Sequence, residues 1–454
     1  MNVENKTVLV IGTGISGIGA AKLLSRVQAK PVLFDTNEEL QIDDIKNKLP
    51  EDIVAEVVVG TIPAEIEEKV SLVVISPGVP VDSPLVEIFR KKNIPIWGEI
   101  ELAYQFAKGK VLAVTGTNGK TTTTSLLGQI MQDYFKSVYV VGNIGNPYTD
   151  IALETKENSV TVAEISSFQL ETIHAFKPTV SAILNITPDH LNRHHTMENY
   201  ITVKEAIASN QTAQDTCVLN YEDDYTHAFG LQTKASVIYF STKRVLEKGI
   251  YLSGEDIYLA DGAAAPEKLM NIHSMKLIGT HNVENAMAAI AMAYSFGVPM
   301  ENIIRTVQTF KAVEHRIEFV ATKKGVDYYN DSKGTNPDAA IKGIQAMCKP
   351  TILIGGGYDK QNEYDEWIDS FDGKVKYLIL IGQTKEKIAD CARRHGFTDI
   401  IFAENLKEVM QICEEKAQPG DAVLLSPACA SWGMFPNYEI RGKMFKEFVN
   451  NIKE

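Results

Sequence analysis

Short runs of β-branched and aliphatic residues alternate with longer amphipathic segments along the chain. This alternation is typical of parallel β-sheets that are covered by helices. In the N-terminal part it predicts strands at 7–11, 30–34 and 72–75 and a helix at 15–26. The first block of alternating elements ends near Trp97.

The same pattern continues in two further blocks, and a chain of 454 residues is long enough for several domains. We therefore predict an α/β protein of three consecutive domains, comprising residues 1–97, 98–310 and 311–454. The second and third blocks contain predicted strands at 111–114, 159–163, 180–184, 326–330, 350–353, 377–381 and 422–425 and a helical segment at 285–295.

Composition excludes several classes of function. Lys and Arg number 45 and Asp and Glu 58, so the formal charge of −13 repels nucleic acids and anionic membranes, and we expect neither as a partner. The longest mostly apolar stretch, 286–298, is shorter than the ~20 residues of a membrane-spanning helix. The first residues show no export-signal pattern, and five widely spaced cysteines without any Cys-x-x-Cys suit reduced thiols rather than disulfides or a zinc site. We therefore expect a folded, cytoplasmic protein.

The first predicted strand runs into a segment with the pattern G-x-G-x-x-G. Gly12, Gly14 and Gly17 lie between a strand and a helix, and Asp35 closes the next strand. Such glycines let the backbone approach a phosphate, and the acidic residue can accept ribose hydroxyls. Ser76, in a turn after a later strand, could close over the same ligand. The motif predicts a Rossmann-like domain, but an NAD site, a nucleotide-sugar site and a glycine turn without a ligand remain open.

A second phosphate loop gives a stronger signal. The sequence LAVTGTNGKTTTTSLL predicts a strand, a glycine-rich loop and a helix, although Val114 stands at the first glycine position of the common P-loop pattern. Loop amides can bind phosphate oxygens, Lys120 adds positive charge, and a threonine hydroxyl can bind magnesium. We predict a P-loop ATP-binding domain whose loop contains Gly116, Thr117, Asn118, Gly119, Lys120, Thr121 and Thr122. Two nucleotide-type sites in one chain suggest a transfer reaction.

Polar residues follow two strands of the second block. Glu164 comes directly after an apolar strand, where a carboxylate could complete the coordination of magnesium. Asp189 and His190 follow the next strand, and this cluster could bind a metal, phosphate or both. Judged without a family context, His190 stays open between a ligand and a solvated loop residue. On the same basis His194 and His195 are interpreted as surface residues and Lys204 as a solvated lysine.

The third block has two strand-end loops rich in polar groups. The segment 329–336, YNDSKGTN, combines hydrogen-bond donors with a carboxylate and suits an anionic substrate beside nucleotide phosphates, although a simple turn with a capped helix is the alternative. The segment LLSPACASW offers Ser426 and Ser431. We interpret Cys429 in this segment as a small buried residue, since no histidine lies nearby in the sequence.

Taken together, the motifs TGTNGKTT, AEISSFQLE, NITPDHLNRH, GTHNVEN, EHRIE, NDSKGTN and LLSPACASW, with the spacing of Tyr200 and Lys204, resemble the Mur ligases of peptidoglycan synthesis. TGTNGKTT and HNxxN are shared with folylpolyglutamate synthetases, whereas SSFQLE, NDSKGTN and SPACAS resemble the members that add D-glutamate. The resemblance covers essentially the whole chain. It implies a Rossmann-like N-terminal domain, a central P-loop ATP-binding domain and a Rossmann-like C-terminal domain.

The resemblance also implies the reaction and its cofactors. ATP would phosphorylate the L-alanine carboxylate of UDP-N-acetylmuramoyl-L-alanine, and the D-glutamate amine would attack the acyl phosphate to form an amide. Mg²⁺ would be bound by Thr121, Glu164 and His190, and Lys204 would carry a carbamate formed from carbon dioxide on the metal side. Lys120, Glu164, His190 and Lys204 would thus be the catalytic residues. The enzyme is expected to act as a monomer.

Binding residues follow from the same resemblance. Further ATP contacts fall on Asn282, Asn285, Arg316 and Asp331; the UDP-substrate contacts on Ser16, Asp35, Thr36, Ser76 and Asn143; and the D-glutamate contacts on Lys333, Thr335 and Ser431. Trp432 and Tyr438 stand where some relatives have leucine and phenylalanine, so the wall of the D-glutamate pocket can differ.

Three alternatives remain at this point. A related ligase could add L-alanine, a diamino acid or folate glutamate instead of D-glutamate. An NAD-dependent oxidoreductase would use the first glycine motif but would leave TGTNGKTT and the later blocks without a role. A nucleotide-gated binding protein would bind ATP without turnover.

Overall fold

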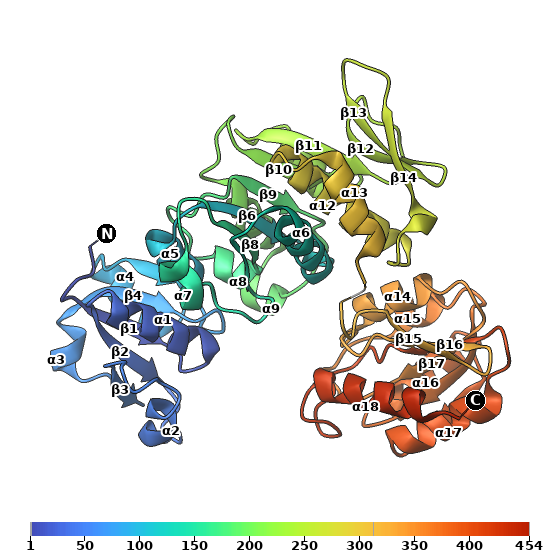
Figure 1. Cartoon of the computed structure of the whole chain (residues 1–454). Helices are drawn as coiled ribbons and strands as arrows, with labels where there is room; N and C mark the ends of the chain where they lie inside the picture. The colour runs from blue at the N-terminus through green and yellow to red at the C-terminus, as the bar shows by residue number, and fades with distance from the viewer. Residues whose placement is uncertain (1, 312, 454) are drawn as a thin grey trace. The chain divides into compact units, whose positions relative to one another are not determined.

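The computed structural model describes residues 2–311 and 313–453, and these residues form three β-sheets with covering helices (Figure 1). The α/β fold class is therefore confirmed. By contacts the described chain divides into two compact units, of which the first contains two of the sheets. The first unit runs up to Ile272 and includes Glu284–Gln308, and the second comprises His273–Val283 and the residues from Thr309 onward.

The N-terminal sheet is fully parallel, with the order β3-β2-β1-β4-β5. Its central strands are buried on both faces, which explains their nearly continuous apolar sequences. Helix α1 packs its apolar face, including Leu23 and Leu24, into the core. The elements are β1 (Thr7–Ile11), α1 (Ile15–Arg26), β2 (Lys30–Asp35), α2 (Ile42–Lys46), β3 (Glu56–Val59), α3 (Ala64–Glu67), β4 (Val70–Ile75), α4 (Pro84–Lys91), β5 (Ile96–Gly98) and α5 (Glu99–Phe106).

The middle sheet has the order β14-β13-β12-β11-β10-β9-β6-β8-β7. Strands β6 to β11 are parallel to their neighbours, and β12, β13 and β14 add an antiparallel arm. The strands are β6 (Lys110–Thr115), β7 (Val138–Gly142), β8 (Val160–Glu164), β9 (Val180–Ile183), β10 (Thr216–Asn220), β11 (Ser236–Ser241), β12 (Lys248–Ser253), β13 (Asp256–Asp261) and β14 (Glu267–Asn271). The α-helices of this part are α6 (Lys120–Tyr134), α7 (Tyr148–Ile151), α8 (Ser167–Leu170), α9 (Leu191–His194), α10 (Met197–Glu205), α11 (Asp224–Gly230), α12 (Thr280–Ser295) and α13 (Met300–Thr309).

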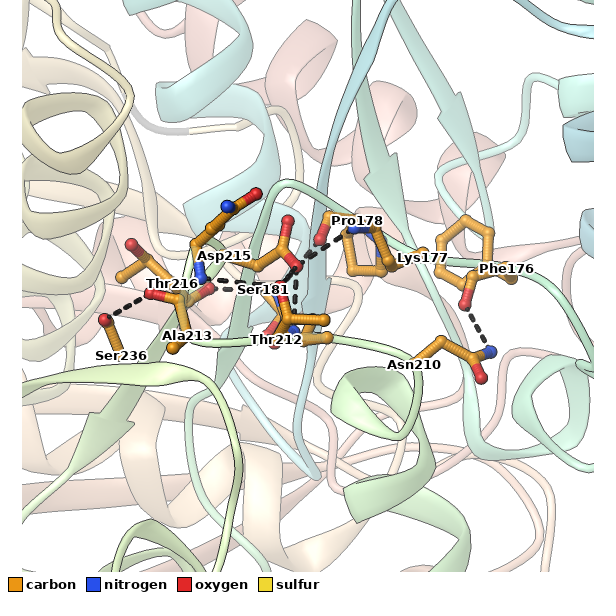
Figure 2. Close-up of polar contacts among 12 residues, drawn as sticks. Phe176, Lys177, Pro178, Ser181, Asn210, Thr212, Ala213, Asp215, Thr216 and Ser236 are labelled. Atoms are coloured by element: carbon orange, nitrogen blue, oxygen red, sulfur yellow. Dashed lines mark hydrogen bonds and ion pairs between the residues drawn. The ribbon is translucent and has the colours of Figure 1, made fainter.

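A polar network fixes the amino ends of β9, β10 and β11 (Figure 2). Asp215 accepts hydrogen bonds from Lys177 Nζ at 3.1 Å and from the amide of Thr212 at 2.9 Å. Ser236 donates to the carbonyl of Ala213 at 3.0 Å. Because ligand sites of parallel sheets lie at the carboxyl ends of the strands, this network serves stability rather than chemistry.

The C-terminal sheet has the order β15-β16-β20-β17-β18-β19, with β15 antiparallel to β16 and the other strands parallel. Separate apolar clusters, one with Trp367 and one with Phe445, account for its core. Its elements are β15 (Glu318–Lys323), β16 (Val326–Asn330), α14 (Pro337–Gln345), β17 (Thr351–Gly355), α15 (Asp365–Asp369), β18 (Val375–Leu380), α16 (Lys385–Arg394), β19 (Ile400–Phe402), α17 (Leu406–Lys416), β20 (Ala422–Leu425) and α18 (Tyr438–Asn451).

The sequence predicted the central elements well and the edge elements poorly. Strands β1, β16 and β20 and helix α1 have the predicted bounds, whereas the antiparallel arm and β15 depart from the expected parallel pattern. Gly254 and Gly262, both with positive φ, form the turns of the arm. In the described part of the chain, every helix is too short or too polar to cross a bilayer.

Candidate active site

The phosphate loop joins β6 to α6, as predicted. Gly116 and Gly119 have φ values of +147° and +85°, a region that L side chains rarely adopt. A side chain at position 119 would also collide with the carboxamide of Asn285 on α12. The loop thus requires glycine at these places, and its backbone amides stand at the amino end of a helix, where anions bind.

A second loop, which follows β9, holds the phosphate loop in place. The amide of Asn118 donates to Asn185 Oδ1 at 2.8 Å, and the amide of Thr187 donates to Thr117 Oγ1 at 3.0 Å. The Thr117 hydroxyl in turn lies 3.1 Å from the Tyr200 hydroxyl of α10. Protein contacts alone therefore brace the loop.

Two lysines meet at this loop. Lys120 donates to the carbonyls of Gly116 and Thr117 at 2.8 Å each, and Lys204 donates to the same Gly116 carbonyl at 2.8 Å. Lys204 is only 1% exposed and its amine lies 4.7 Å from the centre of the Tyr200 ring. Burial, followed by the positive charge of Lys120, holds the pKa of Lys204 well below its usual value. The interpretation of Lys204 as a solvated lysine, made from its local sequence, is wrong.

Glu164 is the last residue of β8. It pairs with Val114 of the neighbouring strand β6, which leads into the phosphate loop. The side chain is 1% exposed, and Oε1 accepts a hydrogen bond from Asn143 Nδ2 at 2.8 Å. Among the described residues, nothing donates a hydrogen bond to the buried Oε2. A buried carboxylate oxygen that receives no hydrogen bond and lies beside a phosphate loop is suited to bind a divalent cation such as Mg²⁺, which prefers oxygen ligands.

The histidine segment that follows β9 differs partly from expectation. His190 has φ +52°, lies 3.5 Å from Asp189 and packs 4.8 Å from the Phe168 ring, with half of its side chain exposed. His194, expected at the surface, is 4% exposed; it contacts Ser167 Oγ at 3.0 Å, and burial lowers its pKa to about 4. His195 is exposed, as expected.

The N-terminal glycine loop brings three strand ends together. Asp35 accepts a hydrogen bond from Thr13 Oγ1 at 2.9 Å, and Gly12, with φ +101°, approaches Ser76 so closely that a side chain would clash with it. Ser76 Oγ is buried, and none of the described residues forms a hydrogen bond with it. Two further polar residues lie close by in the sequence: Ser16 is half-buried and Thr36 is exposed.

Contacts join the turn that follows β4 to the histidine segment of the middle sheet. Arg193 donates to the carbonyl of Val79 at 2.8 Å and to Glu171 at 2.6 Å, and His195 lies 2.9 Å from Asp82. The turn that begins at Ser76 is therefore tied to the loop that carries His190.

In the second unit, a buried guanidinium joins two polar loops. Arg441 of α18 is 1% exposed and donates to Ser332 Oγ at 2.9 Å, to the Ser332 carbonyl at 2.7 Å and to the Cys429 carbonyl at 3.3 Å. Ser332 precedes Lys333, whose amine lies 5.4 Å from the centre of the Tyr438 ring, and Cys429 lies two residues before Ser431. Cys429 is buried, as expected. Sequence reasoning missed Arg441.

Asp331 lies next to this pair of loops. Its side chain is 5% exposed, accepts a hydrogen bond from Ser426 Oγ at 2.7 Å, and has its pKa raised by burial to about 7, although Arg316 and Arg441 oppose the shift. Of the two α12 asparagines, Asn282 donates to the Ile278 carbonyl at 2.7 Å and Asn285 accepts from Thr123 at 3.3 Å. Thr335 is half-buried and Ser431 is buried.

Comparisons with known proteins support the Mur ligase resemblance along the whole chain. Family models described as Mur ligase MurD-like N-terminal domain, Mur ligase middle domain and Mur ligase glutamate ligase domain match residues 6–98, 114–293 and 315–429. The chain is 58% identical to the UDP-N-acetylmuramoylalanine--D-glutamate ligase of Lachnospira eligens, with both chains covered completely. The chain belongs to the Mur ligase family.

Other relatives agree with this assignment. The enzyme of the same description from Clostridioides difficile is 44% identical, again over 100% of both chains. A crystal structure of the UDP-N-acetylmuramate-alanine ligase of Thermotoga maritima matches with a TM-score of 0.62 and 20% identity, covering 99% of this chain and 100% of that one. A MurF structure from Acinetobacter baumannii matches with a TM-score of 0.60 and 18% identity, covering 96% and 93%. These structures support the Mur ligase fold.

Asp331 gives a prediction about stability in this Mur ligase. A carboxyl group that protonates more easily in the folded than in the unfolded chain costs stability as the pH rises from about 3.8 to about 7. We expect Asp331→Asn to raise the melting temperature by several degrees at pH 8 and by almost nothing at pH 4 or below. Thermal unfolding of the full chain at several pH values measures this. Asp372→Asn, at an exposed turn, is the control, and a gain at Asp331 that is independent of pH would contradict the prediction.

Proposed function

We propose that this chain is an ATP-dependent ligase that adds D-glutamate to UDP-N-acetylmuramoyl-L-alanine in the synthesis of peptidoglycan precursors. The observation that carries the proposal is the full-length identity of 58% with a ligase of that description. The braced phosphate loop and the buried carboxylate beside it support ATP and Mg²⁺ as reactants of the middle domain. We further propose that the enzyme works as a monomer in the cytoplasm, where ATP and UDP-sugars are made.

The chemistry needs two transfers in sequence. The L-alanine carboxylate attacks the γ-phosphorus of ATP, the bond to the β-phosphate oxygen breaks, and ADP leaves. The D-glutamate amine then attacks the carbon of the acyl phosphate, giving a tetrahedral intermediate that loses a proton from nitrogen and expels phosphate to leave an amide. Both steps develop negative charge on oxygen, so positive groups that are already in place lower the barriers.

The middle domain would hold ATP and the metal. Lys120 can exchange its two loop carbonyls for phosphate oxygens at the start of α6, where a helix end favours anions. The family resemblance implies that Gly116, Thr117, Asn118, Gly119, Thr121 and Thr122 would contact ATP there. Mg²⁺ held by Thr121, Glu164 and His190 would neutralise phosphate charge. Asn282, Asn285, Arg316 and Asp331 would contact ATP, as the family resemblance implies.

A carbamate on Lys204 is the finer part of the proposal. The neutral amine attacks carbon dioxide, a nitrogen–carbon bond forms and a proton leaves, which converts a buried amine into an anion near Lys120. The lowered pKa of Lys204 favours the neutral amine that this reaction needs. The anion would lie on the metal side of the site.

The outer domains would bind the other substrates. Ser16, Asp35, Thr36 and Ser76 would contact the uridine diphosphate, and Asn143 would contact the sugar part. The buried Ser76 hydroxyl, which has no hydrogen-bond partner among the described residues, supports this role. Lys333, Thr335 and Ser431 would bind the D-glutamate carboxylates, since Arg441 holds the loops on which they lie.

Release of ADP and phosphate tests this function. With UDP-N-acetylmuramoyl-L-alanine, ATP and Mg²⁺, we expect release that depends on D-glutamate and falls to background with L-glutamate, L-alanine or lysine. Turnover with a different amino acid would leave the ligase mechanism in place but move the specificity to another Mur-type or folylpolyglutamate-type reaction. ATP binding without turnover in any mixture would favour a binding protein instead.

A further inference from the structure

Helices α15 and α16 of the C-terminal unit bring four metal-ligand side chains together away from the loops described above. Asp365 and Asp369 stand four residues apart on α15, and Cys391 and His395 stand four residues apart on α16 and its C-cap. Residues at this spacing share one helix face, so each helix presents a pair of ligands to the other. A metal site here would depart from the expectation that the cysteines are reduced thiols rather than part of a zinc site, because it pairs one cysteine with ligands from a second helix that cysteine spacing does not reveal.

The ligand atoms are already close to the geometry of a metal site. The carboxylate of Asp365, the sulfur of Cys391 and a ring nitrogen of His395 all lie within 4.8 Å of one another. A tetrahedral zinc ion with ligands at about 2.0–2.3 Å keeps them roughly 3.5 Å apart, so side-chain adjustments of about 1 Å suffice. Cys391 is 2% exposed and lies in the apolar core of this unit.

We propose that Asp365, Cys391 and His395 form a binding site for a divalent cation of the zinc class, with Asp369 as the residue that orients His395. His395 Nε2 lies 2.9 Å from Asp365 and is the nitrogen placed to bind the ion. His395 Nδ1 lies 2.6 Å from Asp369. A carboxylate on the other ring nitrogen is the usual partner of a metal-bound histidine, because it fixes the ring and raises its basicity.

One cationic side chain of the protein competes with a metal ion for Asp365. Arg394, 3.7 Å from Asp365, is an exposed competitor that can turn toward solvent.

The donor set decides between classes of metal. A thiolate and an imidazole suit zinc and its spectroscopic substitute cobalt, whereas Mg²⁺ prefers oxygen ligands only. A second group of candidate ligands in the described chain, Glu314, His315 and Glu318, has no thiolate and is less suitable. There Lys446 already bridges the two glutamates at 3.0 and 2.5 Å and competes with a cation for them.

A bound ion would stabilise a helix that contacts one of the proposed substrate-binding loops. Tyr364, the residue before Asp365, places its hydroxyl 3.1 Å from Cys429 Sγ in the loop that leads to Ser431. An ion that joins α15 to α16 would thus hold the helix from which this contact comes. The site itself uses none of the proposed ATP or substrate ligands.

Cobalt titration of the reduced full-length protein tests the proposal. We expect one equivalent of Co²⁺ to produce thiolate-to-cobalt charge transfer in the near ultraviolet and tetrahedral bands in the visible, and excess Zn²⁺ to abolish both. The proposed magnesium site contains no thiolate, so charge transfer reports only on a cysteine site. Absence of charge transfer in the wild-type protein would overturn the proposal.

Matched variants assign the ligands. Cys391→Ser should lose the charge-transfer band, whereas Cys348→Ser, which alters an exposed cysteine, should keep it. Asp369→Asn should keep the band but weaken Co²⁺ binding by about 10–100-fold. His395→Gln, at a partly exposed position, should lose the tetrahedral spectrum, and circular dichroism checks that each variant is folded. A band that survives in both Cys391→Ser and His395→Gln would overturn the assignment.

Discussion

Lys204→Arg is expected to lower turnover by about 10²–10³-fold, the loss that follows removal of one group that stabilises charge in a transition state. Lys204 is buried with its amine on the Gly116 carbonyl, and its pKa is held far below the usual value by burial and by Lys120. Arginine keeps the positive charge but stays protonated and forms no carbamate. Steady-state release of ADP and phosphate measures the loss, and thermal unfolding shows whether the variant is folded.

Two further measurements separate the carbamate from a simple cation. Lys204→Ala should be inactive and should not recover in high bicarbonate, but acetate should restore part of its turnover, because acetate can supply a carboxylate in the vacated space. When ¹³C-bicarbonate is supplied, a ¹³C-labelled carbamate carbon should be detected in the wild-type protein and should be absent in Lys204→Arg. Lys177→Arg, at the structural ion pair with Asp215, is the control and should retain full activity (Figure 2). Wild-type turnover of Lys204→Arg would refute the carbamate.

The central elements of the fold were predictable because their sequences have one interpretation. A parallel strand buried on both faces reads as a continuous apolar run, as at β1 and β20, and at β1 a following glycine loop marks the carboxyl end of the strand. The arm of β12 to β14 was missed, since its strands alternate and lie at the edge of the sheet. Its signal was present in the two turns at Gly254 and Gly262.

Burial of polar side chains was the part of the site that sequence could not supply. Tyr200 and Lys204 share one face of α10, but only the packing of that face against the phosphate loop shows that both are 1% exposed. His194 was placed at the surface for the same reason, because its partners Ser167 and Glu171 come from another strand-end segment. Arg441 follows the recognised motifs by several residues, and its role depends on two loops that only the fold brings together.

The second large effect is expected for Glu164→Gln. The substitution keeps an oxygen that can accept the hydrogen bond from Asn143, so the fold of β8 should survive. It removes the negative charge of the carboxylate. At the position of the buried Oε2, which receives no hydrogen bond from the described residues, it places either an amide N–H₂ group or an uncharged, weaker oxygen ligand. A carboxylate that binds Mg²⁺ at phosphates contributes several kcal/mol of charge stabilisation, so turnover should fall by about 10³-fold.

The dependence on Mg²⁺ distinguishes a metal ligand from a merely structural carboxylate. If Glu164 binds the ion, Glu164→Gln should need much more Mg²⁺ for half-maximal activity, and the residual rate should rise as Mg²⁺ is added. Glu157→Gln is the matched control, because it makes the same chemical change on a side chain that is 84% exposed shortly before the same strand. An unchanged Mg²⁺ profile in Glu164→Gln, together with a lower melting temperature, would show that the carboxylate only supports Asn143. That outcome would remove Glu164 from the proposed Mg²⁺ ligands and leave Thr121, His190 and the phosphate oxygens to bind the ion.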